Sequence, residues 1–224
     1  MSQADKTLDT SFPPIGTTGI DGGNVYVIAV QPDGKILIGG QFTTYNGLEA
    51  LRLIRLNADG SRDMSFDTGF TVASIQATSG MAVQRIFIQP DGKILIHGSY
   101  GYSPLLMRLN SDGSRDTDFN PTTFAGYGIN NILLQSDGKI LVTTATYYPY
   151  LARLNADGSR DTSFDIGNIF SDGMAGDMIL QMVNGVEKIL VGESKYNSSA
   201  VARLMRFNLD GSLDTSFSAT GLGA

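Results

Sequence analysis

One recurring phrase constrains the fold of this chain more than any other feature. It is first complete at residues 55–66, which read Arg-Leu-Asn-Ala-Asp-Gly-Ser-Arg-Asp-Met-Ser-Phe. It returns at residues 108–119, 153–164 and 206–217, and a partial copy lies at residues 6–12. A period of about 50 residues is typical of propellers and other repeat arrays. We therefore expect one repeat domain over residues 1–224, with repeats 1 to 4 near residues 13–66, 67–119, 120–164 and 165–217.

A second phrase predicts a tight hairpin near the start of each repeat. Residues 31–35 read Gln-Pro-Asp-Gly-Lys, an identical copy stands at 89–93, and Gln-Ser-Asp-Gly-Lys stands at 135–139. Proline suits the start of a type I turn, and glycine suits the left-handed position that follows. A three-residue loop with a bulge would place Val30 opposite Ile36 and Ile88 opposite Ile94. In repeat 4 the dipeptide Asn-Gly at 184–185 predicts a rebuilt hairpin.

The recurring phrase contains a second tight turn, so each repeat is expected to hold four strands. The middle strands, such as residues 51–56, are apolar on both alternating faces, which indicates that both faces are covered. We predict an all-β β-propeller of four blades, each a four-stranded antiparallel sheet. The short final strand occurs five times, one copy more than four blades need. The array is therefore either a closed ring or an open arc completed by oligomerisation.

The two phrases together resemble the delta-60 repeat family. The residues that carry the resemblance are Gln-Pro-Asp-Gly-Lys-Ile-Leu-Ile at 31–38 and 89–96, and Arg-Leu-Asn-Ala-Asp-Gly-Ser-Arg-Asp-Thr-Ser-Phe at 153–164. The resemblance covers nearly the whole chain. It implies a β-propeller and brings no general activity and no catalytic residue with it.

Composition excludes several classes of function. With no Cys and a single His, the chain lacks disulfides, thiolate metal sites and most His-dependent mechanisms. A net charge of −6 argues against nucleic acid as the main partner, because binding phosphates requires clustered Lys and Arg. No apolar run approaches the roughly 20 residues that cross a bilayer, and we see no signal peptide. We expect no cofactor, no membrane partner, and a location in the cytoplasm or in a particle such as a virion.

A recurring arginine and aspartate are the first candidate site. The turn in the phrase would bring each arginine opposite an acid across the sheet, where the two can pair and hold the register. The pairs are Arg55 with Asp63, Arg108 with Asp116, Arg153 with Asp161, and Arg206 with Asp214. They could form a ring of charge that binds an anion. We favour a structural clamp in each repeat, because each charge has its own partner.

Three other motifs are better explained without a metal, catalytic or glycosylation site. The Asp-rich turns, such as residues 57–61, lack the acids that an EF-type calcium loop requires at Arg55 and Phe66. His97 is the only histidine and has no nucleophile motif near it in sequence. The glycosylation pattern at residues 197–199 has no secretory context in this sequence.

Five tyrosines form the one candidate ligand surface. They lie in matching variable loops of repeats 2 and 3 and are Tyr100, Tyr102, Tyr147, Tyr148 and Tyr150. Tyrosine is favoured at recognition surfaces because it offers a flat ring with a polar tip. The rings could instead pack between repeats.

The sequence therefore predicts a protein that is not an enzyme. We expect a structural or protein-interaction module of a larger assembly, such as a phage virion or tail component, with other protein subunits as partners. The alternative is a module that binds carbohydrate or another ligand through the Tyr-lined loops. A hydrolase using carboxylates at the propeller mouth ranks last, because the acids belong to turns and clamps.

Overall fold

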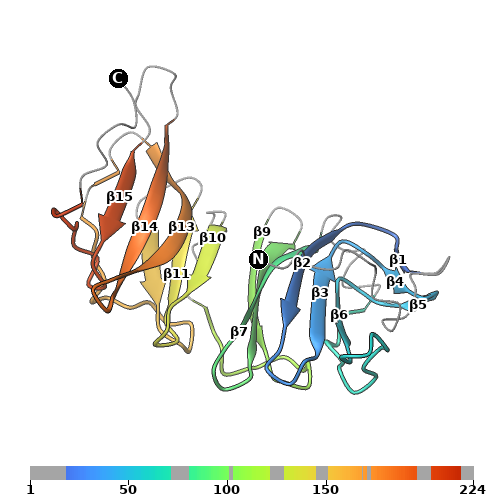
Figure 1. The fold of residues 1–224 in the computed structure, drawn as a ribbon. Coiled ribbons are helices and arrows are strands. Elements are labelled where there is room, and N and C mark those ends of the chain that lie inside the picture. The colour runs from blue at the N-terminus through green and yellow to red at the C-terminus, as the bar shows by residue number, and fades with distance from the viewer. Residues whose placement is uncertain are drawn as a thin grey trace, which may run out of the picture. The chain divides into compact units, whose positions relative to one another are not determined.

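The computed structural model describes residues 19–71, 81–100, 103–121, 129–144, 151–167, 169–170, 173–195 and 203–217. Within these ranges the regular elements are β-strands whose pairings are antiparallel, which confirms the all-β class (Figure 1). The strands are β1 (Ile20–Asp21), β2 (Val25–Val30), β3 (Ile36–Gly40), β4 (Thr44–Tyr45), β5 (Leu48–Glu49), β6 (Leu53–Leu56), β7 (Ala82–Ile88), β8 (Ile94–Tyr100), β9 (Ser103–Leu109), β10 (Ile129–Leu134), β11 (Ile140–Thr144), β12 (Leu151–Leu154), β13 (Gly173–Val183), β14 (Val186–Lys195) and β15 (Leu204–Phe207). Nothing in the described ranges forms a helix that could cross a membrane.

Each repeat contributes one three-stranded sheet. The sheets have the strand orders β2-β3-β6, β7-β8-β9, β10-β11-β12 and β13-β14-β15. A fifth small sheet, β1-β4-β5, belongs to repeat 1 and is called the cap sheet below. Consecutive strands are neighbours in each of the four larger sheets apart from the cap-sheet insertion between β3 and β6, as the short loops in the sequence require.

The fourth strand expected in each repeat is not formed as a strand in the described residues. In its place stands one isolated bridge, which joins Leu56 to Arg62 in repeat 1 and recurs in the other repeats. The chain turns away after the bridge because the carboxylate of Asp63 accepts a hydrogen bond of 3.0 Å from the amide of Ser65. A local bond of this kind competes with the sheet ladder. The prediction of four-stranded sheets is corrected to three strands and a bridge.

The first turn forms as the sequence predicts. Val30 lies opposite Ile36, and Ile88 lies opposite Ile94. Gly34 has a φ of 84°, and its amide donates a hydrogen bond of 2.9 Å to the residue that precedes the loop. This left-handed conformation explains why the loop ends in glycine.

The hairpin of repeat 4 is rebuilt with a shorter loop. Asn184 and Gly185 have φ values of 51° and 79°, and the flanking residues Val183 and Val186 are paired. Two consecutive positive φ values define a type I′ turn, whose twist matches that of the flanking strands. The Asn-Gly prediction is therefore confirmed.

A register irregularity near the start of the first strand recurs in all four sheets. It falls between Val25 and Val27, Val83 and Arg85, Ile129 and Asn131, and Ala175 and Met178. Bulges bend a strand and increase its twist. The apolar pattern of the sequence does not reveal them.

The middle strands of repeats 1 to 3 are covered on both faces, as predicted. All five residues of β11 are buried, and so are four of the five residues of β3. Strands of this kind read as nearly continuous apolar runs because neither face meets water.

The chain divides into two compact units, and the single-domain expectation stays a prediction. The first unit holds residues 1–101 and 108–115, and the second holds residues 102–107 and 116–224. In the first unit Phe42 and Ala50 pack on Ile38, Ile54 and Leu56 of the β2-β3-β6 sheet, with side chains of the cap sheet beside them. In the second unit one apolar cluster joins β11 and β12 to the β13-β14-β15 sheet.

Candidate functional site

The clearest polar site is the arginine–aspartate clamp, which is seen most completely in repeat 3. Arg153 stands on β12, and the turn that follows brings Asp161 opposite it, where the Asp161 amide donates to the Arg153 carbonyl at 2.9 Å. The Arg153 Nε donates to Asp161 Oδ2 at 2.8 Å. Both side chains are buried. A charge-assisted hydrogen bond of this length is stronger than one between neutral groups.

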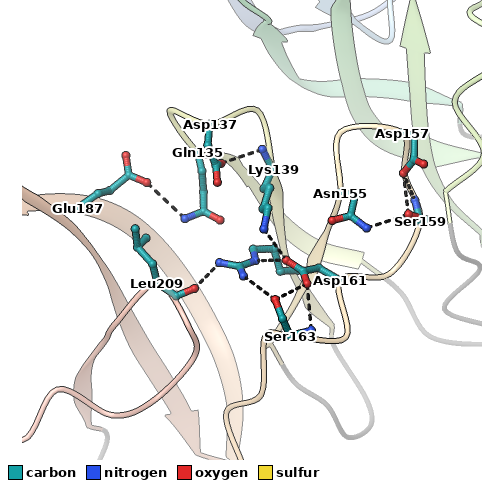
Figure 2. A network of polar contacts seen from close by, with 11 residues as sticks. Gln135, Asp137, Lys139, Asn155, Asp157, Ser159, Asp161, Ser163, Glu187 and Leu209 are labelled. Carbon is teal, nitrogen blue, oxygen red and sulfur yellow. Dashed lines mark hydrogen bonds and ion pairs between the residues drawn. The ribbon is translucent and has the colours of Figure 1, made fainter.

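Two further residues complete the coordination of Asp161 (Figure 2). Lys139 Nζ donates to Oδ2 at 2.9 Å. The amide and hydroxyl of Ser163 donate to Oδ1 at 3.0 Å and 2.6 Å. The carboxylate thus accepts four donors, about as many as its lone pairs allow. The Ser163 hydroxyl bond, and after it those from Lys139, the Ser163 amide and Arg153, hold the pKa of Asp161 well below its ordinary value, although burial opposes them.

Repeat 1 contains the same clamp. Arg55 Nε and Lys35 Nζ each lie 2.8 Å from Asp63 Oδ2. The amide and hydroxyl of Ser65 donate to Oδ1. The Lys35 bond is the main cause that lowers the pKa of Asp63, followed by the Ser65 hydroxyl bond.

Repeat 4 repeats the arrangement with one change. Arg206 Nε donates to Asp214 Oδ2 at 2.9 Å, and Ser216 bonds Oδ1. Lys188 Nζ lies 3.4 Å from Asp214 Oδ2 and donates to Asn208 Oδ1. The Ser216 hydroxyl bond is the main cause that lowers the pKa of Asp214.

In repeat 2 an acid replaces the serine of the clamp. Arg108 and Asp116 are both buried, and their pairing stays a prediction. The amide of Asp118 donates to Asp116 Oδ1 at 3.1 Å. Asp118 stands where Ser65 and Ser163 stand in repeats 1 and 3, so a carboxyl group takes the place of a hydroxyl group.

The clamp arginine also reaches the next repeat. Arg55 Nη1 donates to the carbonyl of Ser111 in repeat 2, and Arg153 Nη1 donates to the carbonyl of Leu209 in repeat 4. The guanidinium of Arg153 lies over the ring of Phe164, 4.8 Å from its centroid. Arg55 lies over Phe66 and Arg206 over Phe217 in the same way, each at 4.6 Å. Arg55 and Arg153 therefore each connect their own sheet, their phenylalanine and the turn of the next repeat.

Backbone contacts complete each junction between consecutive repeats. The amide that follows the clamp phenylalanine donates to a turn aspartate carbonyl of the next repeat. The three bonds are Asp67 to Asp112 at 3.0 Å, Asn120 to Asp157 at 3.1 Å, and Asp165 to Asp210 at 3.2 Å. The turn glycine then lies so close to the preceding repeat that a Cβ at Gly211 would be 2.7 Å from the Asp165 carbonyl oxygen. These contacts are called the repeat junction below.

Repeat 4 uses a different outward partner. Arg206 Nη1 donates to Oε1 of Gln181 in the same sheet, at 3.2 Å. The equivalent glutamines of the other repeats are Gln31, Gln89 and Gln135, and their Oε1 atoms are buried without a hydrogen-bond partner among the described residues. The outward donor of a clamp arginine thus bonds either the next turn or its own glutamine.

The remaining sequence candidates are His97, the loop tyrosines and two sequence motifs. His97 is buried in β8 opposite Arg85. Tyr102, Tyr147, Tyr148 and Tyr150 lie outside the described residues, as does the side chain of Tyr100. Residues 6–12 and 197–199 also lie outside the described ranges.

The exposed turn acids serve their own turns. Asp59 Oδ1 accepts the amide and hydroxyl of Ser61 at 2.9 Å and 2.7 Å, and the hydroxyl bond is the main cause that lowers the Asp59 pKa. In the part of the chain that the structure describes, no three His, Cys, Asp or Glu residues are grouped to hold a metal ion.

The lysine and serine donors of the clamp were not recognised in the sequence. Their signal is nevertheless present. A lysine ends the first turn phrase in each repeat, and in three repeats a serine stands two residues after the clamp aspartate. Both residues can be predicted as donors to the clamp carboxylate, because a buried charge requires several hydrogen-bond partners.

The comparisons with known proteins agree with the repeat pattern. A family model described as "Domain of unknown function (DUF5122) beta-propeller" matches residues 31–66, 89–119, 135–164 and 188–217, more than half of the chain. The match supports the β-propeller repeats that the resemblance implied, although the delta-60 name is not part of it. A search of curated proteins found no match.

Two solved structures are similar over much of the chain. A xylan β-1,4-xylosidase from Bacillus halodurans C-125 has 14% identity and a TM-score of 0.38, covering 91% of this chain and 45% of that one. Drosophila semaphorin 1a, extracellular domains 1–2, has 11% identity and a TM-score of 0.36, covering 87% and 54%. The chain spans about half the length of these structures, and neither similarity bears on its activity.

Proposed function

The chain belongs to the β-propeller family described as domain of unknown function (DUF5122), and we propose that it is a non-catalytic structural module of a larger protein assembly. In this proposal the four repeats are the four blades of a propeller, which is either a closed ring or an arc completed by other subunits. A particle such as a phage virion is the setting expected from the sequence. The proposal has one main support, which is the way the buried acids are used.

The buried clamp acids of repeats 1 and 3 have no lone pair left for catalysis. A general base or nucleophile needs a lone pair that can face the substrate. Asp161 already accepts bonds from Lys139, Arg153 and two donors of Ser163. Asp63 has the same four kinds of donor. These acids therefore support a role in holding the repeats rather than in a reaction.

A substrate and ligand screen of the purified chain tests the proposal. We expect no hydrolysis of a chromogenic glycoside panel and no retention on a glycan array. Asp161→Asn should lower the unfolding midpoint, and the exposed turn variant Asp137→Asn should not. Hydrolysis that Asp161→Asn abolishes would overturn the proposal.

The same array tests the carbohydrate alternative. Glycan retention that is lost in the Tyr147→Ala/Tyr148→Ala double variant would assign the chain to ligand binding through its Tyr-lined loops. Retention of none of the glycans, with the double variant folding normally, would leave the structural module as the supported function.

A further inference from the structure

At the repeat junctions, one face of a sheet packs toward the next repeat and the opposite face packs toward the preceding repeat. The outgoing face is defined here as the face that carries the clamp arginine, such as Arg55 with its cross-strand neighbour Leu37. The incoming face is the opposite one and carries Ile38. At the first junction, Gly39 on the outgoing face packs against Val83 of repeat 2, since a Cβ at Gly39 would be 2.7 Å from a Val83 methyl carbon.

The incoming face of repeat 1 is uncovered along β2. Ile28 is 62% exposed and Val30 is 65% exposed. The residues that match Ile28 in the register of the other sheets are Ile86, Ile132 and Met178, and all three are buried. The counterparts of Val30 are half-buried in the same three repeats, so both positions of the strip are more exposed in the first repeat than in the others. The cap sheet and its adjoining loops pack on the same face of β3 and β6, which confines the open strip to β2.

The outgoing face of repeat 4 is uncovered in a complementary way. Leu37, Leu95 and Leu141 occupy one register position of the first three sheets and are fully buried. Leu190 occupies this position in repeat 4 and is only half-buried. Its neighbour across the sheet, Ile179, is 55% exposed.

In repeat 4 the clamp arginine also does not make the hydrogen bond to a following turn that Arg55 and Arg153 make. Arg206 donates to Gln181 of its own sheet, whereas Arg55 and Arg153 donate to a turn carbonyl of the next repeat. The residue of repeat 1 that matches the acceptors Ser111 and Leu209 is Ala58, which is exposed. The Tyr45 hydroxyl of the cap sheet bonds the neighbouring Gly60 carbonyl, at 3.0 Å, and not that of Ala58.

We propose that the outgoing face of repeat 4 docks on the β2 strip of repeat 1 in a second copy of this chain. The occupant is argued from continuity, because the two open surfaces are the two halves of an interface that this chain already builds between its own repeats. Such a head-to-tail contact is heterologous, so it produces rings or filaments of copies. On docking, Arg206 exchanges Gln181 for the Ala58 carbonyl of the second copy. The inference rests on the proposed structural function and names its partner.

The oligomeric state of the full chain tests this proposal. Native mass measurement over a wide concentration range should show species larger than one chain. Ile28→Asp and Ile179→Asp each place a charge on one exposed docking position, and each should weaken association more than about a hundredfold. Because each variant keeps one intact face, a mixture of the two should form dimers that grow no further. Met64→Asp, a change at an exposed apolar residue in a turn, should associate like the parent chain.

The arginine provides a second readout. Gln181→Ala should leave Arg206 free for the second copy and tighten association, whereas Arg206→Met should weaken it roughly tenfold. A parent chain that stays one chain in mass at every concentration overturns the docking proposal, whether its ends meet each other or stay open. Association that both aspartate variants retain also overturns it. Neither result changes the outcome of the glycoside and glycan screens, so a failure here is distinguishable from a failure of the structural function.

Discussion

Repeats 3 and 4 contain the same clamp, but their arginines bond different outward partners. Arg153 and Arg206 lie 2.8 Å and 2.9 Å from their clamp aspartates. Both lie over a phenylalanine ring at similar distances. Outward, Arg153 donates to the Leu209 carbonyl of the next repeat, whereas Arg206 donates to Gln181 of its own sheet.

The difference shows which part of the clamp is local. The bonds to the aspartate come from two hairpins of the same repeat, so every repeat with both phrases can form them. The outward bond depends on what lies beyond the sheet. Where a turn carbonyl is present the arginine takes it, and the glutamine oxygen of that repeat, Gln135, has no hydrogen-bond partner among the described residues. The outward partner of the clamp arginine thus differs between a repeat that has a following repeat and one that does not.

Removal of the arginine should have the largest effect and should separate the two repeats. Arg153→Met leaves Asp161 without its buried partner and should cost about 3–5 kcal/mol of unfolding free energy. Arg206→Met should cost about 1–2 kcal/mol less, because it forfeits a bond to a neutral amide and no contact between repeats. Urea unfolding of both variants measures the difference. Equal losses would show that the outward bond of Arg153 adds nothing.

Two glycine substitutions separate backbone strain from junction packing. Gly138 and Gly211 have φ values of 83° and 94°, so an alanine at either position is strained. A Cβ at Gly138 would be 3.9 Å from its nearest neighbour, Ala156, whereas at Gly211 it would be 2.7 Å from Asp165. Gly211→Ala should therefore destabilise by about 1–3 kcal/mol more than Gly138→Ala in thermal unfolding. A difference near zero would mean that the repeat 3–4 junction yields without cost.

Acid titration should show that the aspartate side of the two clamps is alike. Folding lowers the pKa values of Asp161 and Asp214 below the ordinary value of about 3.9. The unfolded chain therefore binds protons first, so the clamp stability is complete above about pH 4 and declines as the pH falls below it. Carboxyl NMR should find neither group titrating near the ordinary value. An ordinary pKa for Asp214 alone would show that the clamp needs a following repeat.

The smallest expected effect extends the comparison to repeat 2. Asp118→Ser introduces the hydroxyl that Ser163 supplies to its clamp at 2.6 Å. It should stabilise the chain by about 0.5–1.5 kcal/mol, the usual contribution of one such hydrogen bond. Thr117→Ser, at the exposed neighbouring position, is the control and should change the melting temperature little. A destabilised Asp118→Ser chain would show that repeat 2 needs the acid for another purpose.

Much of the local structure could be predicted from the phrases. The loop residues at 32–34 and 184–185 specify turns with positive φ, and these turns set the strand register. The same reasoning placed Arg55 opposite Asp63. These features depend on a few neighbouring residues, so a single sequence is enough to reveal them.

Other features escaped prediction because they depend on competition. The fourth strand reads as a strand, but Asp63 captures the amide of Ser65 and ends the ladder. Lys139 was missed although a lysine ends the first turn phrase of each repeat, because its partner Asp161 lies in the second hairpin. The cap sheet lies outside the repeated phrases, so the phrases could not predict it.

By itself the sequence determined the repeat, its hairpins and the pairing of charges within each repeat, because those follow from backbone preferences over short stretches. The tertiary structure decided which face of each sheet is covered and where each arginine sends its outward bond. Ile28 and Ile86 are the same residue at the same register position of their sheets, yet one is exposed and the other is buried. Burial depends on whether another repeat packs on the residue, and the sequence of a repeat does not show whether it has such a neighbour.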